Sequence, residues 1–243
     1  MGNARKEYVL SRSVRIDRQT LVFDADDTLW ENNVLFERVV DAYLDWLAHP
    51  TLDRAATRAV LDEVERANVV VHGYGSASFL RSLHDCFERL SERPATPAEA
   101  REIEELAAAL VFDEVELVPG VDETLAELGG RHDLLLLTKG RQAEQQRKID
   151  ASNLAHHFAG VHIVAEKHVG TYRSLVAEQG LEPGATWMIG NSPRSDILPA
   201  RAAGLNAVFV PNPHTWALEE DELDPADPGV LHLRHFRELT AHF

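Results

Sequence analysis

Three aspartates follow a short apolar run near the start of the chain, within TLVFDADDTLW at residues 20–30. The apolar residues at 21–23 do not alternate with polar ones, which predicts a strand buried on both faces. Asp24, Asp26 and Asp27 then place three carboxyl groups at its C-terminal end. Such a cluster is costly without a cation, and carboxylate and carbonyl oxygens suit Mg²⁺. This stretch alone also allows a simple acidic turn, in which Asp bonds to the local backbone.

Polar side chains also follow three later apolar runs, at 134–137, 161–164 and 186–189. Helical segments separate these runs, and no hairpin signals occur, which predicts βαβ units and a parallel sheet. Parallel strands end at one edge of a sheet, and ligands bind there. We therefore expect the residues after the runs to share one crevice with the aspartates. These residues are Thr138, Lys167, Asn191 and Asp196.

The carboxylates suit phosphoryl transfer. Asp24 is the expected nucleophile, and an aspartyl phosphate would divide one difficult displacement into two easier ones. Asp26 leaves the strand on the same side, so it can protonate the leaving oxygen and later activate water. Mg²⁺ held by Asp24, the backbone carbonyl of Asp26 and Asp196 would offset the negative charge. Asn191 can offer a further oxygen, directly or through water.

The remaining polar residues suit phosphate binding. Thr138 offers a hydroxyl, and the amides of Lys139 and Gly140 are expected to open a helix whose N-terminus favours anions. Lys167 would neutralise charge on the nucleophile and on the transferring group.

These motifs resemble those of the haloacid dehalogenase (HAD) superfamily. The chain matches the DxDxT pattern at 24–28, the hydroxyl motif at Thr138, the motif lysine at Lys167 and the glycine–acid–Asp motif at 190–196, with Asn191 where Asp is common. The resemblance covers residues 21–211. It implies a Rossmann-like α/β core at 1–32 and 112–243, a small all-helical cap at 33–111, and Mg²⁺ as cofactor. We expect Asp196 to carry the metal ligation.

The resemblance also limits which reactions of the superfamily are expected. Dehalogenases of this superfamily lack an acid at the position of Asp26, so its presence favours a phosphatase or a phosphomutase. The phosphonate hydrolases need a cap lysine, and none occurs between Lys6 and Lys139. A phosphatase acting on a small phosphomonoester is the first expectation. A phosphomutase and a catalytically weakened phospho-ligand-binding protein, suggested by Asn191, are the alternatives.

The insert after the first motif has helical periodicity throughout. Helices are expected at 34–47, 51–67, 78–90 and 96–110, the last with Thr96 as cap, Pro97 at the first position and Glu99 completing a capping box. The run at 69–71 is expected to lead into a glycine-containing turn. Four residues near this turn could line a substrate pocket beneath the cap: Tyr74, Ser76, Phe79 and Arg81. For Tyr74 and Phe79, a place in the cap core is an equally open interpretation.

Composition limits the partners. The formal net charge of −16 over 243 residues argues against a sequence-independent grip on nucleic acid. No apolar run approaches the roughly 20 residues of a membrane span, and no signal peptide is evident. We expect a cytoplasmic monomer or homodimer with a small phosphorylated metabolite as its partner. The single cysteine, Cys86, is expected to be a core thiol.

Three other segments carry weaker signals. A zinc site formed by the histidines near residue 160 is disfavoured, because they lack paired ligand spacings. Residues 8–16 fit an edge strand or a surface segment, and Phe236 and Leu239 could dock a last helix in the tail at 212–243. The histidines are His156, His157, His162 and His168.

Overall fold

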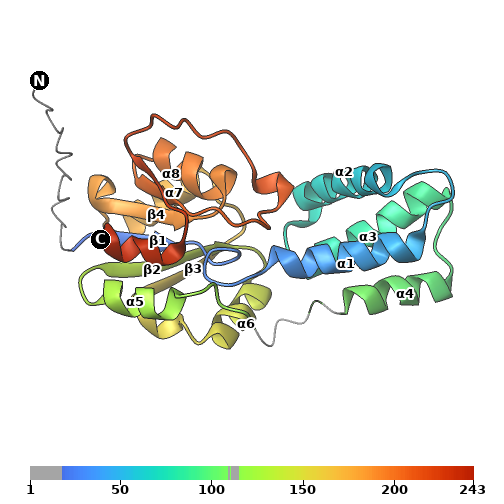
Figure 1. Cartoon of the computed structure of the whole chain (residues 1–243), viewed down its shortest axis with the longest axis horizontal. Helices are drawn as coiled ribbons and strands as arrows, with labels where there is room; N and C mark the ends of the chain where they lie inside the picture. Colours follow the sequence, from blue (N-terminus) through green and yellow to red (C-terminus); the bar gives the residue numbers. More distant parts are fainter. Residues whose placement is uncertain (1–17, 109, 111–114) are drawn as a thin grey trace, which may run out of the picture.

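The computed structural model describes residues 18–108, 110 and 115–243, and shows a sheet-based core beside a bundle of helices (Figure 1). The core sheet has six strands in the order β3-β2-β1-β4-β5-β6, and all neighbouring pairs are parallel. The predicted α/β fold with a Rossmann-like parallel sheet is confirmed. The strands are β1 (Thr20–Phe23), β2 (Asp133–Lys139), β3 (Gly160–Val164), β4 (Thr186–Gly190), β5 (Asn206–Phe209) and β6 (Val230–His232).

Strand β1 lies inside the sheet, and its apolar side chains are buried on both faces. Leu21 and Phe23 join the hydrophobic cluster on the face covered by α5 (Val121–Gly129), whereas Val22 joins the cluster on the opposite face. Figure 1 shows α7 and α8 on one side of the strands and α5 and α6 on the other. Burial on both faces explains why the run does not alternate. The other helices of these layers are α6 (Gln142–Ser152), α7 (Val169–Gln179) and α8 (Leu198–Ala202).

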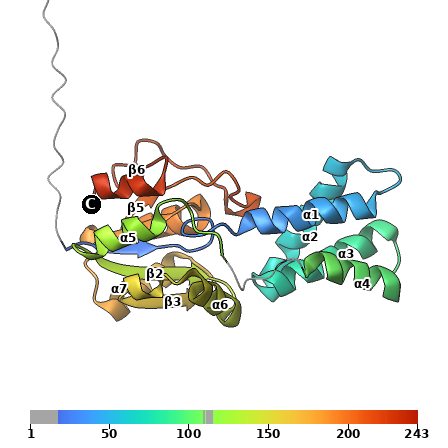
Figure 2. The same cartoon turned by 60° about the horizontal axis from the view of Figure 1, so that its bottom comes forward.

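The C-terminal tail completes the core. A 3₁₀ helix, η5 (Phe236–Ala241), buries Phe236 and Leu239 against the β1 face that α5 covers, as predicted for these two residues. Strand β6 was not expected, because its three residues are only partly buried or exposed at the sheet edge and leave no clear pattern. Figure 2 shows β6 and the C-terminus on the same side of the core as α5. The segment predicted at residues 8–16 lies outside the described residues.

Helices α1–α4 form the bundle and bury their own hydrophobic cluster, which includes the fully buried thiol of Cys86. Thr96 and Glu99 form the predicted capping box at the start of α4. Helix α2 continues through the valines at 69–71, beyond the end predicted at residue 67, and the predicted glycine-containing turn follows with Gly73 as the C-cap, at a φ of 74°. The boundary predicted at 111/112 falls within residues 111–114, which the structure does not describe, so it stays a prediction. The helices are α1 (Asn33–Leu47), α2 (Arg54–His72), α3 (Ser76–Ser91) and α4 (Pro97–Ala107).

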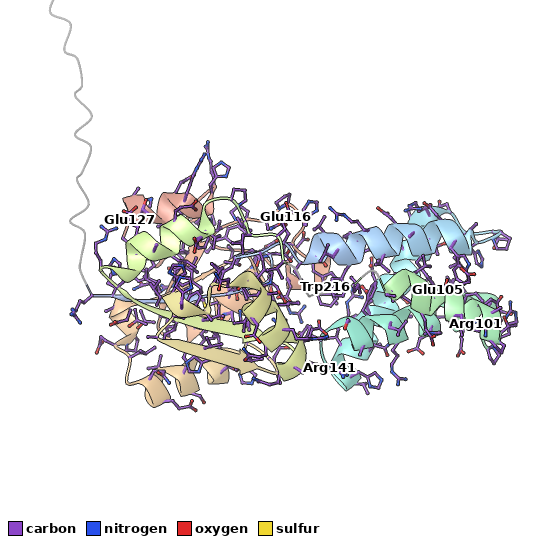
Figure 3. The ribbon with its side chains drawn as sticks, turned by 90° about the horizontal axis from the view of Figure 1, so that it is seen from below. Arg101, Glu105, Glu116, Glu127, Arg141 and Trp216 are labelled. Carbon is purple, nitrogen blue, oxygen red and sulfur yellow. The ribbon has the colours of Figure 1, made fainter. Side chains whose placement is uncertain are left out.

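Two antiparallel chain segments join the core to the bundle, and we refer to the bundle as the cap. The amide of Glu31 donates to the carbonyl of Glu116 at 2.8 Å, and the amide of Val118 donates to the carbonyl of Leu29 at 2.9 Å. Glu116 is labelled near this junction in Figure 3. No helix in the described part of the chain combines the length and apolarity needed to cross a membrane.

Candidate active site

Asp24, Lys167 and Asp196 form a buried charge cluster at the C-terminal edge of the sheet. The Lys167 ammonium donates to Asp24 Oδ1 at 2.5 Å and to Asp196 Oδ1 at 2.8 Å. Asp24 directly follows β1, and its amide continues the ladder by donating to the carbonyl of Ile189 in β4 at 2.9 Å. Residues from three predicted strand ends therefore meet, as expected for a parallel sheet.

The cluster has more negative than positive charge. Burial acts to lower the pKa of Lys167, but the carboxylates of Asp196 and Asp24 outweigh it and hold that pKa above the ordinary lysine value. Burial, reinforced by the charge of Asp24, raises the pKa of Asp196 to about 7 against the opposing effect of Lys167. One ammonium thus serves two carboxyl groups, and an additional cation would be stabilised here.

Asn191 is linked to the same cluster through Thr28. The Thr28 hydroxyl lies 2.9 Å from Asp24 Oδ2 and 3.1 Å from Asn191 Oδ1, so it can donate to either oxygen. The Asn191 amide nitrogen donates instead to the Thr215 hydroxyl at 2.9 Å. This arrangement turns the Asn191 oxygen, rather than its NH₂ group, toward the aspartates.

The donor set fits a hard divalent cation. Asp24 and Asp196 share one ammonium, Asp24 and Asn191 share one hydroxyl, and all the potential ligand atoms are oxygens. Oxygen-only ligation with a surplus of negative charge is the environment preferred by Mg²⁺. The backbone carbonyl of Asp26 stays a prediction as a further ligand.

Asp26 occupies the same cavity but has a separate set of partners. Its carboxylate accepts from the Trp30 indole at 2.8 Å, from the Gln145 amide at 3.2 Å and from the Lys148 ammonium at 3.0 and 3.1 Å. The Gln145 amide also donates to the Thr138 hydroxyl at 2.5 Å. Helix α6 therefore positions both the predicted acid/base and the predicted phosphate-binding hydroxyl.

The segment after Thr138 differs from the prediction at Gly140. The amide of Gly140 donates to the carbonyl of Val164 at 2.9 Å, and α6 begins only at Gln142, so the predicted phosphate contact by this amide is wrong in this structure. A glycine is still required, because its φ is 140° and a Cβ there would lie 3.1 Å from Gln145.

Lys139 contributes its ammonium to the site. It donates to the Ser195 hydroxyl at 2.7 Å, pairs with Glu219 and lies 4.1 Å from the centroid of the Tyr74 ring. Although burial acts to raise it, the pKa of Glu219 is held below its ordinary value, chiefly by Lys139. This ion pair connects β2 to the C-terminal segment, which the sequence had left without a role.

Asp27 has a structural role. Its Oδ1 accepts from the amides of Asn32 and Asn33, each at 2.9 Å, at the start of α1. Burial raises the pKa of Asp27 to about 7, although these two amides act to lower it. The residue thus joins the loop after β1 to the first cap helix, and its exclusion from the predicted ligands stays a prediction.

A cavity of about 140 Å³ extends from the aspartates to the cap. Tyr74 and Phe79 line this cavity, and Phe79 also belongs to the hydrophobic cluster of the cap. The Ser76 hydroxyl donates to Glu144 of α6 at 2.8 Å, which ties the cap to the core. Arg81 is absent from the described lining residues.

Sequence reasoning missed several lining residues. Gln145 and Lys148 are buried and three positions apart on α6, so they share a helix face. Most residues of this helix are polar, so its hydrophobic periodicity does not show which face is buried. Trp216 comes from the tail and lies at the junction of core and cap in Figure 3. Glu65 is a buried acid on an otherwise ordinary amphipathic helix.

The histidines do not contribute to this cavity. His156 and His157 lie with Asp122 so that their potential ligand atoms are within 4.8 Å of one another. The His157 ring bonds to the exposed Asp122 carboxylate at 2.7 Å, which is sufficient explanation for the cluster.

Comparison with known proteins agrees with this architecture. The family model described as haloacid dehalogenase-like hydrolase matches residues 19–204. A phosphoserine phosphatase from Thermus thermophilus is 35% identical over 132 residues, and the match covers 51% of each protein, so the chain spans about half the length of this curated relative.

Solved structures share the fold. A haloacid dehalogenase-like family hydrolase from Xanthomonas campestris superposes with a TM-score of 0.79 at 27% identity, covering 93% of this chain and 90% of that one. A 2-haloacid dehalogenase from Pseudomonas syringae has a TM-score of 0.57 at 21% identity, covering 92% and 96%, and shows the fold alone. The chain belongs to the haloacid dehalogenase-like hydrolase family.

Proposed function

We propose that the chain is a Mg²⁺-dependent phosphatase of a small phosphomonoester. The observation that supports this most strongly is the position of Asp24, buried and bonded to Lys167, in one cavity with a second carboxylate, Asp26. A nucleophile beside a fixed cation and a separate proton-transfer group are the parts that phosphoryl transfer needs.

In the first step, an Asp24 oxygen attacks phosphorus and the bond from phosphorus to the leaving oxygen breaks. Asp26 enters this step in its protonated form and gives its proton to that oxygen, which leaves as an alcohol. In the second step, Asp26 takes a proton from water as the water attacks phosphorus. The Asp24–phosphorus bond then breaks, giving inorganic phosphate and the original carboxylate.

The other residues would orient the phosphoryl group and neutralise its charge. Asp24, Asp196, Asn191 and the carbonyl of Asp26 would hold Mg²⁺, which supplies charge neutralisation for the phosphoryl oxygens. Lys167 keeps its proton throughout and adds a fixed positive charge. The Thr138 hydroxyl, held by Gln145, would bind a phosphoryl oxygen.

A dehalogenase is the competing function, because dehalogenases share the fold. A departing halide needs no proton, so Asp26 would have no task in that reaction. The three donors that hold the Asp26 carboxylate, from Trp30, Gln145 and Lys148, favour a reaction that uses it.

The test is hydrolysis of p-nitrophenyl phosphate by the wild type, with and without Mg²⁺, beside Asp24→Asn. We expect Mg²⁺-dependent release of phosphate and a loss of about 10³-fold or more in the variant. Glu102→Gln, at an exposed position on α4, is the matched control and should retain activity. Activity that survives Asp24→Asn, or no activity with Mg²⁺, contradicts the proposal. Chloride release from 2-chloropropionate would instead support a dehalogenase.

A further inference from the structure

The cap side of the cavity has no positive charge among the described residues that line it. The three lining lysines, Lys139, Lys148 and Lys167, all belong to the core, and each pairs with a core carboxylate. The cap instead contributes Glu37 from α1 and Glu65 from α2. A leaving group that reaches from Asp24 toward the cap therefore meets negative charge.

Glu65 lacks a cation of its own. It is 6% exposed, and no ion pair within 4 Å joins it to a basic residue of the described chain. The nearby Arg58 already bonds both oxygens of Glu37, at 2.6 and 2.9 Å, and Asp62 at 2.6 Å. Three carboxyl groups thus share one guanidinium. Burial raises the pKa of Glu65 to about 7, with Arg58 acting against it.

Ser78 provides an independent sign of a missing ligand. It lies on α3, is 3% exposed and lines the same cavity. Its Oγ has no hydrogen-bond partner in the described part of the structure. Buried hydroxyls are normally satisfied by protein groups or ordered water, so the Ser78 Oγ is an acceptor still open beside the cavity.

The remaining wall is aromatic. Trp216 lies close enough to Glu65 to act to lower the pKa of that carboxyl, and it packs edge-on against Tyr74, with ring centroids 6.2 Å apart. Phe36 and Phe79 form a second edge-on pair at 5.1 Å in the lining. Aromatic faces beside a carboxylate favour an organic ammonium group over an anion.

We propose that the cap side of the cavity binds the ammonium end of a phosphorylated small amino alcohol, with Glu65 as counter-ion and Ser78 accepting an N–H. This inference rests on the proposed function, because it assigns the leaving group for the same phosphoryl site. It disfavours esters with a second anionic group, since a carboxylate or second phosphate would find no cation on the cap. The phosphomutase alternative, which needs a bisphosphate, is disfavoured for the same reason.

Binding can be measured without turnover in the Asp24→Asn protein. Isothermal titration at pH 8 with Mg²⁺ would compare phosphoethanolamine with propyl phosphate, which replaces the ammonium by a methyl group. Two further ligands carry a carboxylate: phosphoserine has it beside an ammonium, and phosphoglycolate has it without one. We expect phosphoethanolamine to bind at least about tenfold more tightly than each of the other three.

Two second-site variants then test the assignment. Adding Glu65→Gln should reduce the ratio of propyl phosphate to phosphoethanolamine dissociation constants to about one, and Ser78→Ala should reduce it in part. Adding Glu102→Gln, with the same charge change outside the cavity, should leave the ratio unaltered.

Each other result overturns the inference: equal or tighter binding of phosphoserine or phosphoglycolate, a preference that survives Glu65→Gln, or no measurable binding of any ester. If phosphoethanolamine binds selectively but the wild type hydrolyses no phosphomonoester, the inference stands and the proposed phosphatase function fails. If the wild type hydrolyses p-nitrophenyl phosphate but prefers anionic esters, the phosphatase function stands and the inference fails.

Discussion

Replacing Glu65 by Gln should stabilise the folded protein at alkaline pH but not at acidic pH. Glutamine keeps the size of the side chain and one of its oxygens, and it removes the ionisable group. The pKa of Glu65 is raised by burial from 4.5 to about 7 in the folded state. The folded protein therefore binds more protons than the unfolded chain between these pH values.

The sign of the effect follows from this difference. The contribution of Glu65 to stability is fully present below pH 4.5 and is lost as the pH rises through about 7. A shift of this size corresponds to an upper limit of about 3 kcal/mol in the free energy of unfolding. That is a large share of the roughly 5–15 kcal/mol of a typical domain. The Gln variant should not show this loss.

The assay is urea unfolding of wild type and Glu65→Gln at pH 4.5, 6 and 8, followed by tryptophan fluorescence in EDTA. Groups shared by the two proteins cancel in the difference. We expect that difference to grow from near zero at pH 4.5 to about 2–3 kcal/mol in favour of the variant at pH 8. Glu102→Gln should show no such trend. A pH-independent difference, or a variant less stable at pH 8, would refute the inference that Glu65 is buried without a matching cation.

Three other substitutions test the candidate catalytic cluster. Lys167→Met leaves Asp24 and Asp196 facing each other without their shared cation, so it should cost about 3–5 kcal/mol in urea unfolding without metal; an unchanged midpoint would contradict the buried charge cluster. Lys148→Met removes the ammonium bonded to Asp26, so it should lower kcat for p-nitrophenyl phosphate about 10- to 100-fold. The far-UV circular dichroism spectrum should be unchanged, and full activity would show that this contact is dispensable. Gly190→Ala places a Cβ 2.1 Å from an Asp196 oxygen, so apparent Mg²⁺ affinity in the activity assay should fall at least about tenfold, and wild-type affinity would argue against Asp196 as a ligand.

The residues at the strand ends could be predicted from the sequence because each lies directly after an apolar run or a few positions beyond it. Asp24, Thr138 and Asn191 follow β1, the leucines of β2 and β4, respectively, and a parallel sheet leaves little freedom in where they meet. The predicted phosphate contact by the Gly140 amide was wrong because it depended on the exact residue at which a strand stops pairing. Whether one amide faces a ligand or extends the ladder depends on where β2 stops pairing with β3, and that is decided by the neighbouring strand.

The sequence by itself determined the fold class, the helical insert and the residues at the strand ends, since local periodicity and strand polarity are properties of neighbouring residues along the chain. Only the tertiary structure decided what surrounds those residues. Lys148 meets Asp26 across 122 positions, Glu219 pairs with Lys139 across 80, and Trp216 reaches Glu65 from a tail with no readable pattern. Such contacts arise from packing between elements, which leaves no periodic trace in either partner. The cap side of the cavity is composed of contacts of this kind.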